Sequence, residues 1–333
     1  LPAPEGGVRL LRARAGAARL RALPGLAGLR CEQSFRPEFE QLLGEGLEVV
    51  DGLQPPAAQD AWVLALPPRQ KDEARALLAR MAAACAPGGR LLCSVANDEG
   101  AKSLEKDFER LFGVAGALAK HHCRVFWSGP FAGARDPALL AQWGALDAPR
   151  PILGGRYLGR PGVFAWDRID PASRLLAEAL PADLRGEAAD LGAGWGFLSD
   201  ALLERCPGVT SLDAYEAEAR ALEPLRRNLA GHAGRRRVDA HWHDVAAGLP
   251  RRFDLIVSNP PFHALGRGDR PDLGRRFIEV AAAALVPGGQ CWLVANRHLP
   301  YEATLQARFA QVRVAAQGQG FKVIAAAGAR AWA

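Results

Sequence analysis

Long apolar runs are absent from the sequence. It contains no stretch of 18 or more apolar residues, and its first residues lack a basic stretch leading into an apolar one. Membrane-spanning segments and export signals have these features. We therefore expect a soluble protein with neither an anchor nor an export signal, and so no membrane partner.

Paired cysteines are absent as well. The six cysteines stand far apart, without the CxxC pairs that are typical of zinc sites and redox motifs. In a chain of 333 residues this spacing predicts buried thiols rather than disulfides, no metal site, and a reducing, cytoplasmic location. The cysteines are Cys31, Cys85, Cys93, Cys123, Cys206 and Cys291.

Lysine is scarce: only five of the 42 basic residues are lysines, and the others are arginines. The net charge of +6 suits a polyanionic partner, although the arginine, alanine and glycine content is equally explained by a GC-rich genome. Local clusters are more informative than the total. Arginines gather in residues 1–30, 235–237, 251–252 and 267–276, and such clusters either follow a phosphate backbone or lie on solvated loops and helix faces.

A chain of this length is expected to form two domains, and the sequence repeats itself. AWVLALPPRQ at 61–70 resembles DLIVSNPPFH at 254–263, and a PGG turn with its flanking segments recurs at 86–112 and 286–312. Each copy alternates strands with amphipathic helices, which is typical of parallel βαβ units. We therefore predict an α/β protein with two tandem doubly wound, Rossmann-like domains.

The two copies, predicted at residues 1–148 and 151–333, differ where chemistry is expected. The Gly- and Pro-rich segment 128–155 is expected to be a linker that carries one short helix, with the domain boundary near residue 150. In the first copy Leu66 stands at the position of Asn259, and no glycine-rich turn precedes it. The first domain is therefore expected to be a degenerate copy that is structural and has no cofactor site.

A glycine-rich turn opens the second copy. In EAADLGAGWGFLSDALL at 187–203, a short apolar run ends in an acid, alternating glycines follow, and a helical pattern starts at Phe197. Glycines let the backbone turn sharply and approach a ligand, and the next helix presents its positive end there. The predicted cofactor-binding residues of this turn are Asp190, Gly192, Ala193, Gly194 and Gly196.

A second acid follows on the next predicted strand. Glu216 lies twenty residues after Gly196, at the end of GVTSLDAYE. There it is placed to bind the two ribose hydroxyls of a nucleoside. Asp213 is the competing candidate, and Glu216 is preferred because a helical pattern begins directly after it.

Two cofactors suit this unit, a dinucleotide and S-adenosylmethionine. The dinucleotide fingerprint GxGxxG requires glycine at position 197, where the chain has Phe197. A carboxylate at Asp190 also suits the ammonium group of S-adenosylmethionine. Asp244, after another predicted strand, is placed to bind the adenine amino group, and a helix N-cap is its structural alternative.

These motifs carry a resemblance. The set DLGAGWG, Glu216, Asp244 and SNPPF has the order and spacing of class I S-adenosylmethionine-dependent methyltransferases. With its degenerate first copy and the segments RPGVFAWDRIDPASRLL and VANRHLPY, the whole chain resembles the bacterial 16S rRNA guanine-N2 methyltransferases of the small-subunit type C group. The resemblance implies methyl transfer from S-adenosylmethionine to guanine N2 in small-subunit rRNA.

The SNPPF segment suits that chemistry. An exocyclic amine is a poor nucleophile, because its lone pair is conjugated into the base. Acceptors that bind its two N–H groups turn the lone pair toward the methyl group, and we expect Asn259 and the carbonyl of Pro260 to be these acceptors. Phe262 is expected to stack on the flipped base, which completes the predicted catalytic set. Asn259 also counts among the cofactor-binding candidates, and Ser258, where related enzymes often carry Asp, has no assigned role.

Further residues are candidate substrate contacts, each with a structural alternative in a loop, a turn or the packing of the core. They are Pro261, His263, Arg267, Arg297 and Lys322, with Asn296 and His298 bordering the cleft.

The expected partner is ribosomal RNA or the small ribosomal subunit, and the expected form is a monomer. Three other functions compete: guanine-N2 methylation of large-subunit rRNA, N-methylation of a protein glutamine, and RNA binding during assembly without catalysis. Phe262 in place of Tyr, the arginine clusters and the duplicated first half favour RNA over a protein substrate. The intact glycine turn together with Asn259 argues against a module without catalysis.

Overall fold

The computed structural model describes residues 3–57, 59–261 and 271–330. The chain divides into two compact units, Leu1–Pro149 and Arg150–Ala333. Each unit contains its own seven-stranded sheet, and the two units are described separately.

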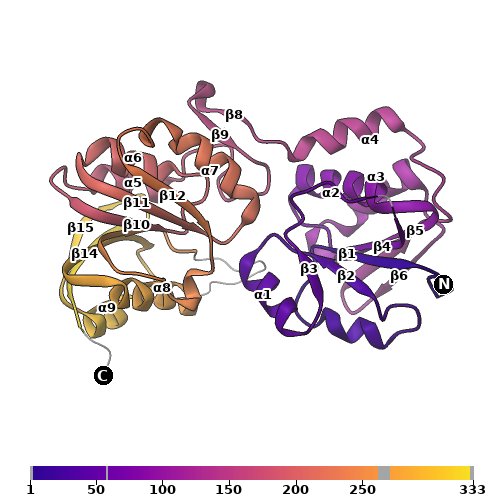
Figure 1. Cartoon of the computed structure of the whole chain (residues 1–333), viewed down its shortest axis with the longest axis horizontal. Coiled ribbons are helices and arrows are strands. Elements are labelled where there is room, and N and C mark those ends of the chain that lie inside the picture. The colour runs from indigo at the N-terminus through magenta and orange to yellow at the C-terminus, as the bar shows by residue number, and fades with distance from the viewer. Residues whose placement is uncertain (1–2, 58, 262–270, 331–333) are drawn as a thin grey trace. The chain divides into compact units, whose positions relative to one another are not determined.

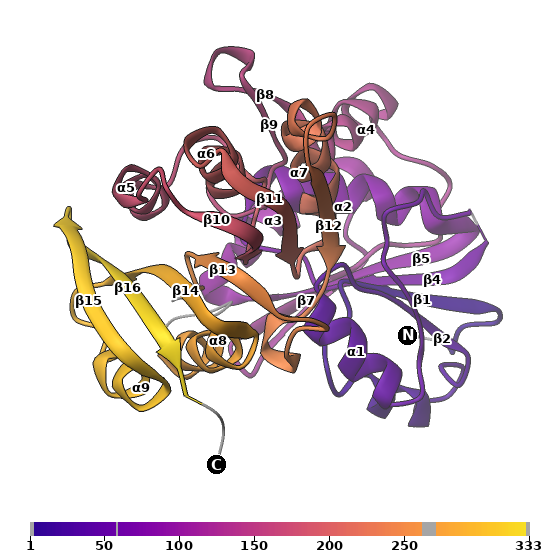
Figure 2. The same cartoon turned by 60° about the vertical axis from the view of Figure 1, so that its left-hand side comes forward.

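The first unit is built around a sheet of order β3-β2-β1-β4-β5-β7-β6, parallel except for β7, which runs antiparallel to both of its neighbours. Helices α2, α3 and α4 cover one face of this sheet and α1 covers the other (Figure 2). The strands are β1 (Gly7–Leu11), β2 (Leu29–Glu32), β3 (Glu48–Val50), β4 (Asp60–Ala65), β5 (Cys85–Ala96), β6 (Gly116–Lys120) and β7 (Cys123–Trp127). The helices are α1 (Arg36–Gly44), α2 (Lys71–Ala84), α3 (Ala101–Phe112) and α4 (Pro137–Gly144).

The short helix expected in the linker is α4, and it belongs to the core of the first unit. Asp136 caps it by accepting a hydrogen bond from the backbone of Leu139 at 2.9 Å, and Pro137 occupies the first turn, where its missing N–H costs nothing. Trp143 is 3% exposed and packs with the residues of α2. Burial of Trp143 therefore joins this helix to the first unit, within the predicted bounds 1–148, although its segment was expected to be a linker.

The second unit repeats the same topology, with the order β12-β11-β10-β13-β14-β16-β15. A separate hairpin of β8 (Arg150–Ile152) and β9 (Tyr157–Gly159) precedes the sheet. The sheet strands are β10 (Arg185–Leu191), β11 (Gly208–Glu216), β12 (Arg237–Trp242), β13 (Phe253–Ser258), β14 (Leu285–Asn296), β15 (Phe309–Gly318) and β16 (Phe321–Ala329). The helices are α5 (Pro171–Ala179), α6 (Phe197–Arg205), α7 (Leu222–Leu229), α8 (Pro271–Ala283) and α9 (Glu302–Arg308).

Helices cover both faces of the second sheet, which explains why the sequences of its central strands are continuous apolar runs. Along β13, Leu255 and Val257 pack against the cluster that includes α5, α6 and α7, whereas Ile256 packs against α8 and α9 (Figure 1). Successive side chains of a strand point to opposite faces. The predicted fold class of two tandem doubly wound sheets is confirmed.

Two further observations concern the expected thiols and membrane segments. All six cysteines are free, and all but Cys123 are buried. In the part of the chain that the structure describes, no helix is long and apolar enough to cross a membrane.

Candidate active site

The candidate site lies where the parallel strands β10, β11 and β13 end. Leu191, the last residue of β10, pairs with Tyr215 on one side and with Ser258 on the other. The strand order reverses between β10 and β13, and ligands of open α/β sheets bind in the crevice at such a switch point. The predicted turn after β10 and the predicted Asn259 turn after β13 therefore meet at one edge.

The glycine turn after β10 has the backbone that its sequence predicts. Gly192, Gly194 and Gly196 have φ angles of 78°, 57° and 97°, a region that other residues rarely adopt. The amides of Gly192 and Ala193 donate to the carbonyl of Tyr215 at 2.9 and 3.0 Å. The turn is thus tied to the end of β11.

Gly196 has a second constraint besides its backbone angle. It is the N-cap residue of α6, and a Cβ atom there would lie 2.8 Å from a methyl carbon of Leu225 in α7. The positive φ angle is what requires glycine at this position, and the close approach of Leu225 adds to the cost of a side chain.

Asp190 is a buried carboxylate with one satisfied oxygen. It is 1% exposed, and its Oδ2 accepts a hydrogen bond from the Ser199 hydroxyl at 2.7 Å. Its Oδ1 is buried without a hydrogen-bond partner among the described residues. Burial raises the pKa of Asp190 to about 7, with a further increase from the charge of Glu216 and a partial decrease from Ser199. A cation placed at Oδ1 would satisfy this oxygen.

Glu216 faces the glycine turn. Its Oε2 accepts the amide of Gly194 at 2.7 Å, and its Oε1 accepts the amide of Glu218 at 2.8 Å. Burial raises the pKa of Glu216 above its ordinary value, although these backbone donors lower it. The carboxylate is therefore held rigidly beside the turn, as a ribose-binding acid requires.

Asp213 is engaged elsewhere. It is 2% exposed, and its carboxylate binds Arg237, Arg251 and His241. Burial raises its pKa, but hydrogen bonds from these three residues outweigh that effect and hold the pKa below its ordinary value. Asp213 stands three residues before Glu216 and so points to the opposite face of the sheet, which supports the assignment to Glu216.

Asp244 has the capping geometry that the sequence allows. It precedes the short 3-10 helix η7 (Val245–Ala247), and its Oδ1 accepts the amide of Ala246 at 2.9 Å. Its side chain is half-buried. An adenine contact for Asp244 remains a prediction.

Asn259 follows β13 directly and is held by two residues that sequence reasoning did not select. Its Nδ2 donates to Asp170 Oδ2 at 2.9 Å and to Ser173 Oγ at 2.8 Å. Its Oδ1 is buried without a hydrogen-bond partner in the part of the chain that the structure describes. Pro260 is buried and Pro261 is exposed. The amide therefore presents an unused acceptor at the edge where the glycine turn lies.

The sequence around Asp170 and Ser173 indicates the start of a helix but not a contact with Asn259. Asp170 caps α5, accepting the backbone amide of Ser173 at 2.9 Å, and Pro171 occupies the first turn. The sequence IDPAS therefore predicts an N-cap. It contains no indication that Asn259, 89 residues after Asp170, shares the same oxygen.

Ser258 has a structural role. It is 3% exposed, and its hydroxyl donates to the carbonyl of Leu191 at 2.8 Å. This bond ties the end of β13 to the end of β10. The predicted contacts Phe262, His263 and Arg267 lie outside the described residues.

Comparison with known proteins assigns the chain to a family. The family model described as methyltransferase small domain matches residues 155–325. A ribosomal RNA small subunit methyltransferase C from Shewanella halifaxensis is 34% identical over 245 residues, which cover 71% of this chain and 68% of the relative. One from Shewanella loihica is 33% identical over 280 residues, which cover 82% of this chain and 79% of the relative. The chain belongs to the ribosomal RNA small subunit methyltransferase C family.

A solved structure agrees over nearly the whole chain. It is that of a 16S rRNA N2 methyltransferase from T. thermophilus in complex with AdoMet and guanosine. It matches with a TM-score of 0.80 and 28% identity, covering 98% of this chain and 90% of that protein. The predicted family resemblance is confirmed, and the match includes both units of this methyltransferase.

The first unit of the methyltransferase keeps the strand register but replaces the site. Leu11 of β1 has the same register position as Leu191 of β10. It pairs with Ala65 at the end of β4, just as Leu191 pairs with Ser258 at the end of β13. The residue after β4 is then Leu66, where the second unit has Asn259. Its backbone amide bonds to the carbonyl of Leu11 at 3.2 Å, but its side chain offers no acceptor.

Gln33 occupies the position of Glu216 in the same register. Its Oε1 accepts the amide of Phe35 at 2.9 Å, just as Glu216 binds the amide two residues onward. Its Nε2 donates to the carbonyl of Ala13 in the turn at 2.5 Å. The first unit therefore has a neutral amide, satisfied internally, where the second unit has an acid.

The turn after β1 keeps part of the backbone of the turn after β10 with different residues. Arg12 and Gly16 have φ angles of 53° and 87°, positive like those of Gly192 and Gly196. Arg14, at the position of Gly194, does not have a positive φ angle. The expectation that no glycine-rich turn is present holds for the sequence, and an arginine side chain stands at position 12 where the second unit has a glycine.

Lys322 is not a surface contact, and this corrects the expectation that it reaches RNA. Its side chain is 7% exposed. Its ammonium group donates to the carbonyls of Arg297 and Leu299, at 3.3 and 3.1 Å, and pairs with Glu302. All three donors are thus used to hold the turn between β14 and α9. Arg297 is exposed on that turn and remains a candidate.

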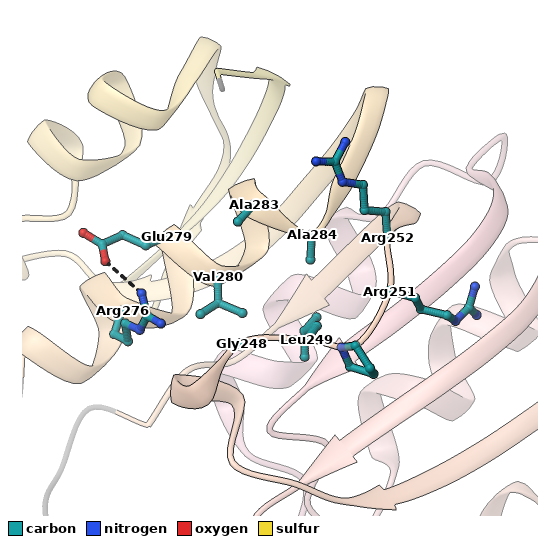
Figure 3. A pocket seen from close by; sticks show the side chains of 10 residues that line it. Gly248, Leu249, Arg251, Arg252, Arg276, Glu279, Val280, Ala283 and Ala284 are labelled. Atoms are coloured by element: carbon teal, nitrogen blue, oxygen red, sulfur yellow. Dashed lines mark hydrogen bonds and ion pairs between the residues drawn. The ribbon is translucent and has the colours of Figure 1, made fainter. Parts of the chain in front are cut away.

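A hollow of about 330 Å³ lies at the other end of β13, between the loop that precedes this strand and α8 (Figure 3). Arg252, Arg276 and Glu279 contribute to its lining, and Arg276 contacts Glu279 at 3.5 Å. Because it borders the beginning of β13, this hollow does not belong to the cofactor edge.

Replacement of Asp190 by Asn should change how stability depends on pH. Between pH of about 4 and about 7 the unfolded chain has lost this proton while the folded chain keeps it, so folding binds a proton and stability falls as pH rises. Asp190→Asn removes this titration, and its stability relative to wild type should increase from pH 5 to pH 8. Urea unfolding of the full chain without ligand at several pH values measures this, with Asp183→Asn as an exposed control. Parallel curves for wild type and Asp190→Asn would contradict the prediction.

Replacement of Lys322 by Met should affect stability rather than RNA binding. The variant loses the hydrogen bonds of a buried cation, and its free energy of unfolding should fall by about 1.5–3 kcal/mol. The salt dependence of RNA binding should keep its slope, because a lost phosphate contact would reduce that slope by about one. Denaturant unfolding and RNA titrations at several salt concentrations check this, with the exposed Lys106→Met as control. A stable variant with a shallower salt slope would restore Lys322 as an RNA contact.

Proposed function

We propose that the second unit transfers a methyl group from S-adenosylmethionine to the exocyclic N2 amine of a guanine in small-subunit rRNA. Family membership supports the reaction class, and the relative solved with AdoMet and guanosine supports the two substrates. The observation that carries the proposal for this chain is the buried, unused amide oxygen of Asn259 beside the glycine turn.

The residues at the edge fit such a cofactor. The glycine turn provides space for close approach, and Asp190 Oδ1 is a buried acceptor that an ammonium group would satisfy. Glu216 would bind the ribose hydroxyls, and Asp244 the adenine amino group. When bound, S-adenosylmethionine supplies a methyl group on a positively charged sulfur.

The proposed task of Asn259 is to orient the amine of guanine. Its Oδ1 accepts one N–H of the amine, and the carbonyl of Pro260 accepts the other. Neither Pro260 nor Pro261 has a backbone N–H, and the fixed φ angles of the two prolines keep the carbonyl in place. With both hydrogens held, the lone pair of the amine would be directed out of conjugation with the ring. The methylated amine would then lose one of these two hydrogens to solvent as a proton. The reaction needs preorganised acceptors and proximity rather than a strong base.

We propose that residues 1–148 do not bind the cofactor. The side chains of Arg12, Gln33 and Leu66 stand in place of the glycine, the acid and the amide of the second unit. This unit would instead support the catalytic unit and help to recruit RNA. Exposed arginines such as Arg14 and Arg19 are available for that task, whereas Arg9 is buried in ion pairs with Asp60 and Glu32.

The test of the substrate uses labelled S-adenosylmethionine. The protein is incubated separately with small subunits, large subunits and free rRNA, and the products are digested to nucleosides. Labelled N2-methylguanosine from small-subunit RNA is expected. Label only in large-subunit RNA, or in a protein glutamine, would overturn the proposed substrate.

Cofactor binding should depend on Glu216 and occur once per chain. Glu216→Ala removes a charged acceptor and should weaken S-adenosylmethionine binding by about 1.5–3 kcal/mol. Gln33→Ala changes the matching residue of the first unit and should leave the affinity unchanged. Calorimetry measures both affinity and stoichiometry. A stoichiometry of two, or a loss of affinity in Gln33→Ala, would show that the first unit binds the cofactor.

Methyl transfer should depend on Asn259, whereas cofactor binding should depend on it little. Asn259→Ala is expected to lose about 2.7–4 kcal/mol of transition-state stabilisation, as other single preorganised polar groups do. Asn259→Asp keeps an acceptor and should retain more activity than Asn259→Ala. Single-turnover transfer to saturating small subunits measures the rates, and calorimetry measures the affinity for S-adenosylmethionine. A wild-type rate in Asn259→Ala would make the segment a structural turn.

A further inference from the structure

The amide group of Asn259 is fixed by two neighbours of different chemistry. Its nitrogen has two hydrogens, and both are donated, one to Asp170 Oδ2 at 2.9 Å and one to Ser173 Oγ at 2.8 Å. The nitrogen therefore has no hydrogen left for a ligand. The oxygen is left with no partner among the described residues.

The two neighbours differ in how strongly they specify this orientation. An ionised carboxylate can only accept hydrogen bonds, so it binds the nitrogen of an amide and repels its oxygen. A serine hydroxyl can donate or accept, and it would tolerate either orientation. Asp170 is thus the residue that decides which way the amide of Asn259 points.

The carboxylate of Asp170 is itself held in position. It caps α5, and the oxygen that binds Asn259 also accepts the amide of Ser173 at 2.9 Å. The segment before it is attached to the glycine turn, because the indole Nε1 of Trp195 donates to the carbonyl of Ala165 at 3.0 Å. Residues 165–170 therefore connect the turn after β10 with the turn after β13.

A negative charge on the nitrogen side also affects the oxygen side. A hydrogen bond from an amide N–H to a carboxylate is charge-assisted, and hydrogen bonds in a chain polarise one another. Asp170 therefore makes Asn259 Oδ1 a stronger acceptor for the N–H of an incoming amine.

We infer that Asp170 and Ser173 are positioning residues that orient and polarise the amide of Asn259 toward the target amine. This inference rests on the proposed function of Asn259. Neither residue contacts the reacting atoms, and both act through Asn259. The helix cap of α5 thus has two tasks, because the same carboxylate begins the helix and aligns the amide.

The test compares the rates at which full-length variants methylate small ribosomal subunits in a single turnover. S-adenosylmethionine is present at a saturating concentration. Asp170→Ala should slow transfer by about 10- to 100-fold, the range for loss of a hydrogen bond to a charged group. Ser173→Ala should slow it by about 3- to 10-fold, the range for a neutral hydrogen bond. The affinity for S-adenosylmethionine should stay the same in both.

Two further substitutions separate the orientation of Asn259 from the helix cap. Asp170→Ser keeps a cap acceptor, but its shorter side chain does not reach Asn259, so the loss should match that of Asp170→Ala. Asp170→Asn keeps an acceptor and adds a donor, so the loss should be smaller. A matched control is Asp136→Ala, which removes the same Asp-Pro cap from α4. It should leave the transfer rate unchanged.

The decisive measurement repeats the substitutions in the Asn259→Ala background. If Asp170 and Ser173 act through Asn259, they should cause no further loss there, because interacting residues are not additive. Equal losses in both backgrounds, or wild-type rates for Asp170→Ala and Asp170→Ser beside an impaired Asn259→Ala, would overturn the positioning inference alone. A wild-type rate for Asn259→Ala itself would instead overturn the proposed function.

Discussion

The parallel pairing of β10 with β13 is the constraint on which the rest of the site depends. It places the end of one strand beside the end of the other, and the bond from the Ser258 hydroxyl to the Leu191 carbonyl fixes that end at 2.8 Å. The glycine turn and Asn259 follow these two residues directly. Because helices cover both faces of the sheet, the strand ends are the part of this layer that is open to ligands.

Burial gives the polar groups at this edge their significance. A buried acceptor without a partner is costly, and two such oxygens, on Asp190 and Asn259, lie in residues of this one edge. Such groups are best explained when a ligand supplies the missing partner. The alternation of side chains along the strands directs Asp190 and Glu216 to one face, whereas Asp213 points to the other and is neutralised by arginines.

The first unit shows what the same backbone becomes when internal groups satisfy it. Its turn keeps positive φ angles at Arg12 and Gly16, and its strand register is unchanged. Yet Gln33 donates to the turn carbonyl instead of presenting a charge. The fold is preserved by apolar packing, which many sequences satisfy, while the site depends on a few side chains.

The sequence by itself determined the duplication, the α/β alternation, the glycine turn and the segment of Asn259, because these depend on local patterns of period, glycine and proline. It left Glu216 and Asp213 as alternatives, since only the face on which a strand residue lies separates them. It could not predict that the ammonium group of Lys322 binds two backbone carbonyls and the carboxylate of Glu302. Nor could it predict that Asp170 and Ser173 hold Asn259, 89 and 86 residues later. The contacts of Asp170 and Ser173 depend on the packing of α5 against the sheet, and those of Lys322 depend on the pairing of β16 with β14. Both join segments that local sequence patterns do not relate, so the tertiary structure alone decided them.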